Sequence, residues 1–495
     1  MALSELSVPQ LRAWGRLRST AVGAGGLLLA LVAGPAIGLL DSQGLAAVVA
    51  VVVCMLLAML LWRIPVSAVL MPAAAALVIE QFPLEFADRL TEHVLVFRSL
   101  NTTGLSGLFV TPSELLLATA VLIWLVRGMA RRDLSLPRSA LAAGLATLVL
   151  FIAAAAVHGM ATGGQLRIVI NEVRPFLYVP VLYLLASQLL RTRGQVWSLL
   201  WVVVLATGFK GIQGSYRSLL LAGLQPARES VLGHEEAVFF SIFILVTAGL
   251  WLFRIKGRLR LVATLLLPFV VNADLANQRR TAWVILPIGL VLLLVSAWVH
   301  CTAQRRRILA FGLVAAALSG LYLGVFWSSS STAAQPARAI RSAFAPSTRD
   351  GNSDQYRVIE NLDLGIDIRQ STPLGLGFGR PIPHPVPLPN DASDLDPLID
   401  YVPHNGVLYE WLRTGIGGAL ALWFVIGAAA VVACRVVRVA DHRLALMGAV
   451  GLCTIAAYVV EGWYDQGLMT YRVAFLVGCV LGSLEAARRI GASAA

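Results

Sequence analysis

Charged residues are scarce in this chain, where they make up 13% of 495 residues. A soluble domain usually carries about 25%. Lysine is nearly missing, since Lys210 and Lys256 are the only two, so the net charge of +12 comes from arginine. The arginines are spread over many short segments and form no continuous basic face. We therefore expect no nucleic-acid partner and no soluble body apart from one long loop.

Sequence patterns for metals and nucleotides are missing as well. The five cysteines form no CxxC pair, so their spacing supports neither a disulfide framework nor a thiolate metal site. No HExxH motif occurs, and Asp391, Asp394, Asp396 and Asp400 are spaced like a solvated acidic run. We predict no metal site and no cofactor. A P-loop is absent too, which excludes ATP-driven pumping by this chain alone.

Apolar sequence is abundant: hydrophobic residues make up 58% of the chain and the mean hydropathy is +0.77. Apolar runs of about 17–25 residues, the length that a bilayer-spanning helix needs, recur from end to end. We therefore predict an all-α polytopic membrane protein with about 12–14 transmembrane helices. The expected segments are 21–40, 44–62, 64–80, 113–127, 139–158, 175–190, 195–209, 235–253, 260–273, 281–300, 308–327, 405–433, 444–460 and 472–487.

Arginine is concentrated in alternate loops between these segments. The positive-inside rule places such loops in the cytoplasm, together with both termini of a multi-pass protein of the plasma (inner) membrane. Arg12, Arg16 and Arg18 precede the first apolar run, which we interpret as an uncleaved helix. The other clusters are Arg127, Arg131, Arg132 and Arg138; Arg191 and Arg193; Arg254, Lys256, Arg258 and Arg260; Arg305, Arg306 and Arg307; Arg435, Arg438 and Arg443; and Arg488 and Arg489.

The remaining loops then face outward, at about 81–112, 159–174, 210–234, 272–280, 328–403 and 461–471. The longest of them divides the chain into transmembrane helices at 1–327, an extracytoplasmic loop at 328–403 and further helices at 404–495. Apolar residues at helical spacing over 354–366 predict an amphipathic helix on or near the membrane surface. A glycine-rich turn follows at 371–380. Loops of this length are often functional.

His404 stands where the long loop re-enters the membrane. A histidine has an unperturbed pKa of about 6.5, which suits a general base, although a helix-capping or headgroup-contacting role is open as well. Asn405 is independently explained as the N-cap of the next helix. His384, in a proline-rich stretch, serves the structure of the loop. His234 and the two glutamates after it mark the start of a spanning helix.

Arginines in the outward loops run against the positive-inside rule. A guanidinium stays charged and its planar fork matches phosphate oxygens. Snorkelling or pairing with a lipid headgroup is the alternative for any single one of them. Taken as a set, they favour binding of a lipid-linked diphosphate. The set is Arg174, Arg217, Arg228, Arg279 and Arg280.

With these residues in hand, the chain resembles the O-antigen ligase and O-antigen polymerase superfamily of membrane glycosyltransferases over 160–425. Residues 171–178 (Asn-Glu-Val-Arg-Pro-Phe-Leu-Tyr) resemble the family's Arg-Pro-aromatic helix entry. Residues 278–283 resemble its Ser-Arg-small-Ala segment, with Arg279 in place of the serine. Residues 357–379 resemble the loop segment that ends in Pro-Leu-Gly-x-Gly. His404 and Asn405, followed by Leu408, Leu412, Gly415 and Gly418, resemble the motif that re-enters the membrane.

The resemblance implies a GT-C-like helical bundle and metal-independent, inverting glycosyl transfer from a polyprenyl-diphosphate-linked glycan. It implies that His404 acts on the acceptor hydroxyl and that Arg280 and Arg217 engage the diphosphate, with Arg228 as a rival to Arg217. The substrate-binding residues expected beside these three are Arg174, Arg228, Arg279, Asn405 and Arg357. The acceptor is a glycan, a lipid or a protein, and ligase and polymerase stay open because they share the donor.

Two other classes stay open. A lipid-linked glycan flippase or polytopic transporter has a similar composition, but no internal repeat or pair of broken helices in corresponding positions supports it. A catalytically inert assembly scaffold is the third interpretation. The loss of function expected for His404→Ala separates a transferase from a scaffold.

Overall fold

The computed structural model describes residues 44–81, 91, 94–100, 109–132, 136–221, 230–388 and 400–493. Within these ranges the secondary structure is helical and contains no strand. Nine of the helices described there are long and apolar enough to cross a membrane, and two shorter apolar helices accompany them. The predicted all-α fold is confirmed, and these helices are those of a multi-pass membrane protein.

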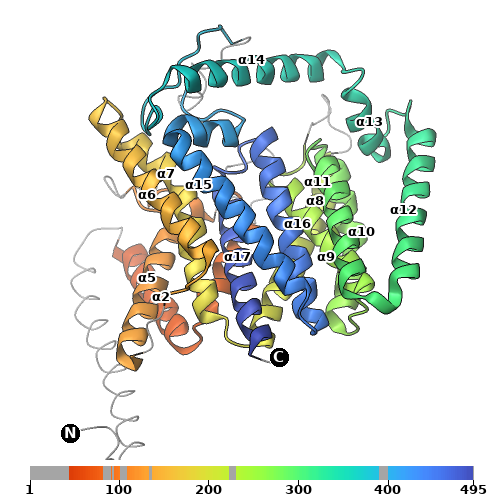
Figure 1. Ribbon diagram of the computed structural model, residues 1–495, viewed down its shortest axis with the longest axis horizontal. Coiled ribbons are helices and arrows are strands. Elements are labelled where there is room, and N and C mark those ends of the chain that lie inside the picture. Colours follow the sequence, from red (N-terminus) through yellow and green to blue (C-terminus); the bar gives the residue numbers. More distant parts are fainter. Residues whose placement is uncertain are drawn as a thin grey trace, which may run out of the picture.

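The helices stand side by side in one bundle (Figure 1), in which α17 packs against α7, α10 against α8, and α15 against both α6 and α16. The predicted segment 21–40 lies outside the described residues, and each other predicted segment coincides with one helix. These helices are α2 (Gly44–Arg63), α3 (Ser67–Val78), α5 (Pro112–Arg131), α6 (Ala140–Ala161), α7 (Leu166–Leu189), α8 (Arg193–Leu221), α9 (Glu236–Leu252), α10 (Arg258–Asn277), α11 (Ala282–His300), α12 (Arg305–Phe326), α15 (Gly406–Val437), α16 (His442–Tyr464) and α17 (Tyr471–Ala492).

Helices α7 and α8 extend into segments that we predicted to be outer loops. We expected Arg174 and Arg217 in outer loops, but Arg174 lies inside α7 and Arg217 inside α8. That expectation was wrong because it took each charged residue as the end of an apolar run. Both side chains are buried and each has a carboxylate partner, so the helix continues past the charge.

The arginine-rich turns share one end of the bundle. His300 at the end of α11 contacts both Val437 and His442, in the turn between α15 and α16. At this end Arg193 also pairs with Asp441. The carboxyl ends of α7 and α17 meet in the same way, through a hydrogen bond from the Arg489 guanidinium to the carbonyl of Leu190, and the C-terminus lies at this end in Figure 1.

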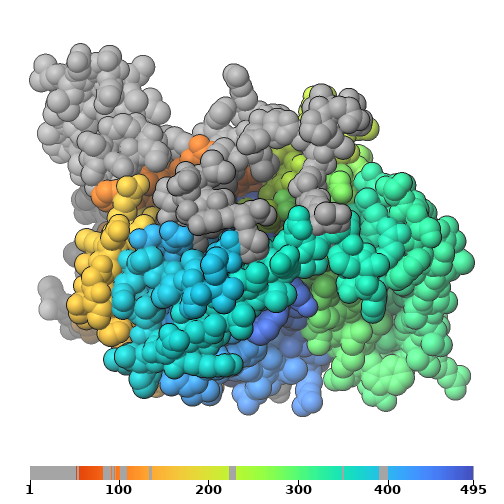
Figure 2. Space-filling model, turned by 90° about the horizontal axis from the view of Figure 1, so that it is seen from above, coloured from red at the N-terminus to blue at the C-terminus, as the bar shows by residue number. Residues whose placement is uncertain are grey.

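The opposite end is crossed by α14 (Thr348–Gln370), which follows the short α13 (Gln335–Ser342) (Figure 1). Figure 2 shows this end from above, with α14 lying across the molecule. The predicted helix at 354–366 is therefore present and extends further in both directions. Its packed side carries carboxylates as well as apolar residues, since Glu360, Asp363 and Asp367 are buried there together with Leu364, while Val358 and Leu362 are exposed.

Candidate active site

The beginning of α15 fixes the position of His404. Asn405 is the N-cap of this helix, and its side-chain oxygen accepts hydrogen bonds from the backbone amides of Val407 at 3.1 Å and Leu408 at 3.0 Å. These bonds satisfy amides that have no partner within the helix. His404 directly precedes this cap, so its backbone is held to the end of a rigid helix. The predicted N-cap role of Asn405 is confirmed.

Glu360 on α14 orients the His404 side chain. Its carboxylate accepts two hydrogen bonds from this one residue, from the backbone N–H at 3.0 Å and from the ring Nδ1 at 3.2 Å. Because a carboxylate only accepts, Nδ1 carries the hydrogen and the lone pair is on Nε2. Tyr356 packs edge-on against the imidazole at 5.6 Å, and the His404 side chain is 33% exposed. The result is an oriented imidazole on a side chain that is partly exposed to solvent.

Two further carboxylates of α14 lie on the same buried face as Glu360. Asp363 accepts a hydrogen bond from the backbone of Val386 at 3.0 Å and lies 3.6 Å from the ring of His384. Burial raises the pKa of Asp367 to about 6, the charge of Asp363 adds to this and His384 opposes it. His384 therefore contacts α14 within the loop, as its structural role requires.

The glycine-rich turn before His404 docks into a kink in α15. Gly415 has φ +70° and ψ −172°, which interrupts the helical hydrogen bonds at this point. The carbonyl of Leu412 then accepts from Leu376 at 2.7 Å, and that of Arg413 accepts from Gly377 at 3.1 Å. A Cβ atom at Gly415 would lie 2.0 Å from the carbonyl oxygen of Pro373, so glycine alone fits this close approach.

Arg413 fastens the same turn from inside α15. Its guanidinium, which is 0% exposed, pairs with the Glu172 carboxylate on α7. It also donates to the carbonyls of Gly377 at 3.0 Å, Arg380 at 2.7 Å and Tyr401 at 3.1 Å. One buried cation thus ties both ends of the segment 377–401 to two membrane helices, which holds the approach to His404 in place.

Arg280 reaches α14 from the turn between α10 and α11. Gln278 ends α10 in a left-handed conformation, with φ +52°, and directs the chain into this turn. The Arg280 guanidinium forms a two-pronged contact with Asp354, at 3.0 and 2.6 Å. Both side chains stay partly exposed, at 32% and 42%. Arg279, in the same turn, lies close enough to the buried Glu461 of α16 for their charges to interact.

Arg357 belongs to a second polar group between α14 and the end of α16. Asp465 lies 3.0 Å from the Nδ1 of His234 and 3.9 Å from the Arg357 guanidinium. Burial raises the pKa of Asp465, but the hydrogen bond with His234 and the charges of His234 and Arg357 more than offset this. The pKa therefore lies below its ordinary value and the carboxylate is charged.

Arg217 belongs to a buried network of charges instead. It lies 3.3 Å from Glu80, which also binds Lys210 at 2.5 Å. Lys210 is 4.0 Å from Glu236, and Arg472 at the start of α17 pairs with Glu235 and Glu236, at 2.7 Å each. Three cations therefore balance three carboxylates, which lowers the cost of burying them. His234 and its two glutamates do mark the start of a helix, since α9 begins at Glu236.

Arg174 is held within the bundle too. Its guanidinium is 2.8 Å from Glu114 of α5 and donates to Asn171 at 2.8 Å and to the carbonyl of Phe109. Tyr178, one turn along α7, donates to the same glutamate at 2.9 Å. These contacts join α7 to the start of α5, so the surroundings of Arg174 are those of a packing contact.

The structure thus brings three of the predicted site residues to one helix. His404 and Arg280 contact α14 and Arg357 lies on it, while Arg174 and Arg217 lie in ion pairs inside the bundle. Asp354 and Glu360, which bind Arg280 and His404, are six positions apart, or about 9 Å along the helix axis. Arg228 lies outside the described residues.

Sequence reasoning missed the carboxylates that position this site. Asp354 and Glu360 were part of the predicted helix at 354–366, but no partner was assigned to them. A signal existed in their spacing, because Asp354, Arg357 and Glu360 recur every three residues and so follow one side of a helix. Arg413 and Glu172 gave no such signal, since they lie 241 positions apart.

Comparison with known protein families and with curated proteins finds no match to this chain.

Proposed function

We propose that this chain is a membrane glycosyltransferase of the O-antigen ligase or polymerase type. It transfers or polymerises a glycan from a polyprenyl-diphosphate donor at the outer face of the plasma membrane, with both termini in the cytoplasm. The observation that carries this proposal is the contact between His404 and Glu360, which orients a partly exposed imidazole at the end opposite the arginine-rich turns. That separation agrees with an outward site under the positive-inside rule.

In this proposal His404 is the general base. Its Nε2 removes the proton of an acceptor hydroxyl as the oxygen attacks the anomeric carbon. The bond to the diphosphate breaks on the opposite side, so that the configuration inverts and the electron pair leaves with the diphosphate. The imidazolium that forms lies against the Glu360 carboxylate, which stabilises its charge. General-base assistance of this kind contributes about 10²–10⁴-fold to a rate.

The leaving diphosphate needs positive charge, and Arg280 is the best-placed donor. Its two-pronged contact with Asp354 is the geometry in which a guanidinium also holds phosphate oxygens. Because this pair is partly exposed, a diphosphate can displace or share the carboxylate without breaking a buried contact. Arg357 and Arg279 add charge from α14 and from the same turn. Fixed cations of this kind stabilise charge as it develops.

One observation favours the second candidate, a flippase or transporter. Ionisable residues inside membrane segments often mark substrate pathways, and the network of Lys210, Glu80 and Arg217 is of this type. The two candidates differ in where the donor collects when function is lost. A transferase variant leaves lipid-linked glycan on the outer leaflet, whereas a flippase variant leaves it on the inner leaflet.

The test is the length and sidedness of lipid-linked glycan in cells that carry His404→Ala as their sole copy. His384→Ala is the matched control, because His384 also faces a buried carboxylate of α14. The amount of inserted protein is measured for both variants. We expect His404→Ala to accumulate outward-facing donor while the control variant behaves as the parent chain does.

The form of the accumulated donor separates the subclasses. Single repeats identify a polymerase, and long chains left on the polyprenyl carrier identify a ligase. Normal surface glycan in cells with His404→Ala removes His404 from the reaction and overturns the proposal. Donor trapped on the inner leaflet transfers support to the flippase.

A further inference from the structure

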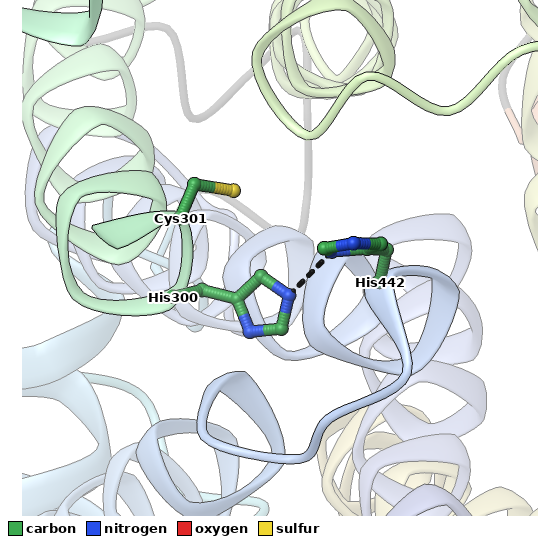
Figure 3. Close-up of side chains that lie close together, drawn as sticks. All are labelled: His300, Cys301 and His442. Atoms are coloured by element: carbon green, nitrogen blue, oxygen red, sulfur yellow. Dashed lines mark hydrogen bonds between the residues drawn. The ribbon is translucent and has the colours of Figure 1, made fainter. Parts of the chain in front are cut away.

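A second cluster of reactive side chains lies at the arginine-rich end, away from α14. His300 and Cys301 end α11, and His442 begins α16 (Figure 3). The Nε2 of His300 is 2.7 Å from the Nδ1 of His442, and one ring nitrogen of each histidine and the Cys301 sulfur all lie within 4.8 Å of one another. Spacing in the sequence could not indicate this cluster, because His442 follows His300 by 142 positions.

The hydrogen bonds around His300 prepare it as a ligand. Its Nδ1 lies 3.0 Å from the carbonyl oxygen of Val437, which can only accept, so Nδ1 carries the hydrogen. The lone pair on Nε2 then faces His442. The ring also stacks on Phe253 at 5.5 Å, which restricts its rotation. A backbone carbonyl that fixes the tautomer of a histidine is a usual partner of a metal-binding imidazole.

We propose that His300, Cys301 and His442 bind one divalent transition-metal ion, with Zn²⁺ as the best fit. Two imidazole nitrogens and a thiolate are ligands that Zn²⁺ prefers, and three protein ligands leave a fourth position for water or another small ligand. Tetrahedral Zn²⁺ holds its ligand atoms about 3.3–3.8 Å apart, given bonds of about 2.0–2.3 Å. The two nitrogens therefore move apart by about 0.6 Å, and the sulfur moves inward by at most about 1.3 Å.

The protons balance in this step. His442 donates its Nδ1 hydrogen to His300 in the metal-free pair, and on binding it takes the other tautomer, with the hydrogen on Nε2. Cys301 releases one proton to solvent and binds as a thiolate. No oxidation or reduction is involved, and the site gains one positive charge.

Two arginines near the cluster in the sequence have other partners. Arg443, next to His442, stacks over Trp197 at 5.2 Å, and Arg305 stacks over Trp298 at 5.3 Å. Asp441 caps α16 through the amides of Arg443 and Leu444, and its charge also acts on His300. The ion would join the turn after α11 to the turn before α16. Because this site lies at the other end of the bundle, its existence does not depend on the proposed function.

The experiment uses the full chain, purified in detergent without a histidine tag, stripped with a chelator and titrated with Co²⁺ and then Zn²⁺. We expect one equivalent of Co²⁺ with the intense visible bands of tetrahedral coordination and a thiolate-to-cobalt charge-transfer band, both lost on adding Zn²⁺. Cys301→Ser removes the charge-transfer band, and His442→Gln weakens binding by at least about 10–100-fold. Cys434→Ser and His158→Gln, at an exposed cysteine and a partly buried histidine, are the controls and leave binding unchanged.

Three results overturn the proposal. The first is the weak spectrum of octahedral Co²⁺ without a thiolate band. The second is the same affinity in the parent chain and in His442→Gln, a substitution at an exposed position that leaves the bundle intact. The third is a thiolate band that Cys434→Ser removes and Cys301→Ser does not, which would place the ion on the other cysteine.

Discussion

The arginines of this molecule divide into two groups that differ in exposure and in what they bind. Arg280 and Arg357 contact carboxylates around α14 and keep 32% and 27% of their side chains exposed. Arg217, Arg413 and Arg472 lie inside the bundle at 3% exposure or less. All five belong to the half of the membrane protein that bears α14, and all five have carboxylate partners, but the two groups differ in burial and in the elements that they join.

This difference indicates which arginines can exchange a partner for a ligand. A buried guanidinium requires compensating charge and acceptors at all times, so its contacts are structural and losing them is costly. A partly exposed ion pair contributes little to stability, because water competes for both partners. The exposed pairs at α14 can therefore exchange a carboxylate for an anionic substrate, and the following substitutions test this division.

The largest effect is expected for Arg413→Met. This substitution leaves the Glu172 carboxylate buried without its cation and releases three carbonyls of the segment 377–401, so the free energy of unfolding should fall by about 3–5 kcal/mol. Denaturant unfolding in detergent measures it. Adding Glu172→Gln should restore part of the loss, since no unpaired charge then remains. Arg369→Met, at an exposed position on α14, is the control and should change stability by less than about 0.5 kcal/mol. Equal losses of stability for Arg413→Met and Arg369→Met would show that buried and exposed arginines do not differ in this way.

Next comes Glu360→Gln, which tests the orientation of His404. Glutamine offers one acceptor oxygen where Glu360 accepts from both the backbone N–H and Nδ1 of His404. One of these two donors must therefore face the NH₂ group of the glutamine. When the donor that faces it is Nδ1 of the ring, the imidazole hydrogen moves to Nε2, and Nε2 can no longer act as a base. We expect transfer to slow by about 10²–10⁴-fold.

Two readouts distinguish this positioning role from a loss of folding. In the His404→Ala background, Glu360→Gln should have no further effect on transfer. Glu360→Asp, which keeps both acceptor oxygens on a shorter side chain, should restore part of the rate and move the pH profile toward that of the parent chain. Additive losses in the double variant would show that Glu360 acts independently of His404.

A smaller effect is expected for Arg280→Gln, which removes one charge from the proposed diphosphate site. Loss of a single donor of this kind costs about 10²–10³-fold in rate. The matched variant is Asp354→Asn, which breaks the same ion pair from its other side and keeps the arginine. If Arg280 binds the diphosphate, Asp354→Asn should keep most of the activity. Similar losses of activity in both variants would show that the ion pair between Arg280 and Asp354 serves to hold α14 in place.

These residues also show how far the sequence alone could reach. The period of the apolar residues predicted the helices, and the helix at 354–366, because a helical face repeats locally. Asn405 could be predicted as a cap for the same reason, since its partners are two and three residues away. Arg174 and Arg217 were misplaced because their counterions are far away in the sequence: Glu114 lies on α5, and Glu80 follows α3.

Long-range pairs form the part of the site that local patterns do not encode. His404 and Glu360 are 44 positions apart, and Arg280 and Asp354 are 74 apart. Taken alone, each of these residues is as typical of a solvated loop as of an active site. These contacts form only because α14 crosses the end of the bundle, which brings Glu360 to His404 and Asp354 to Arg280.

The smallest effect is expected for Asp367→Asn. Asp367 is buried beside Asp363, so its titration reports how firmly α14 is packed on the bundle. Its pKa is raised from 3.8 to about 6, so the folded chain binds this proton more tightly than the unfolded chain does. Stability from Asp367 is therefore greatest at acid pH and falls as the pH rises from about 4 to about 6. Asp367→Asn stays neutral and should lack this dependence.

Hydrogen exchange of residues 348–370 measures the pH dependence of this stability, with the variant and the parent chain compared at the same pH. At pH 7 the variant should be better protected, and below pH 4 the two should agree. Equal protection at both values would show that the Asp367 carboxylate is solvated, and that the packed face of α14 is looser than that of the buried arginines.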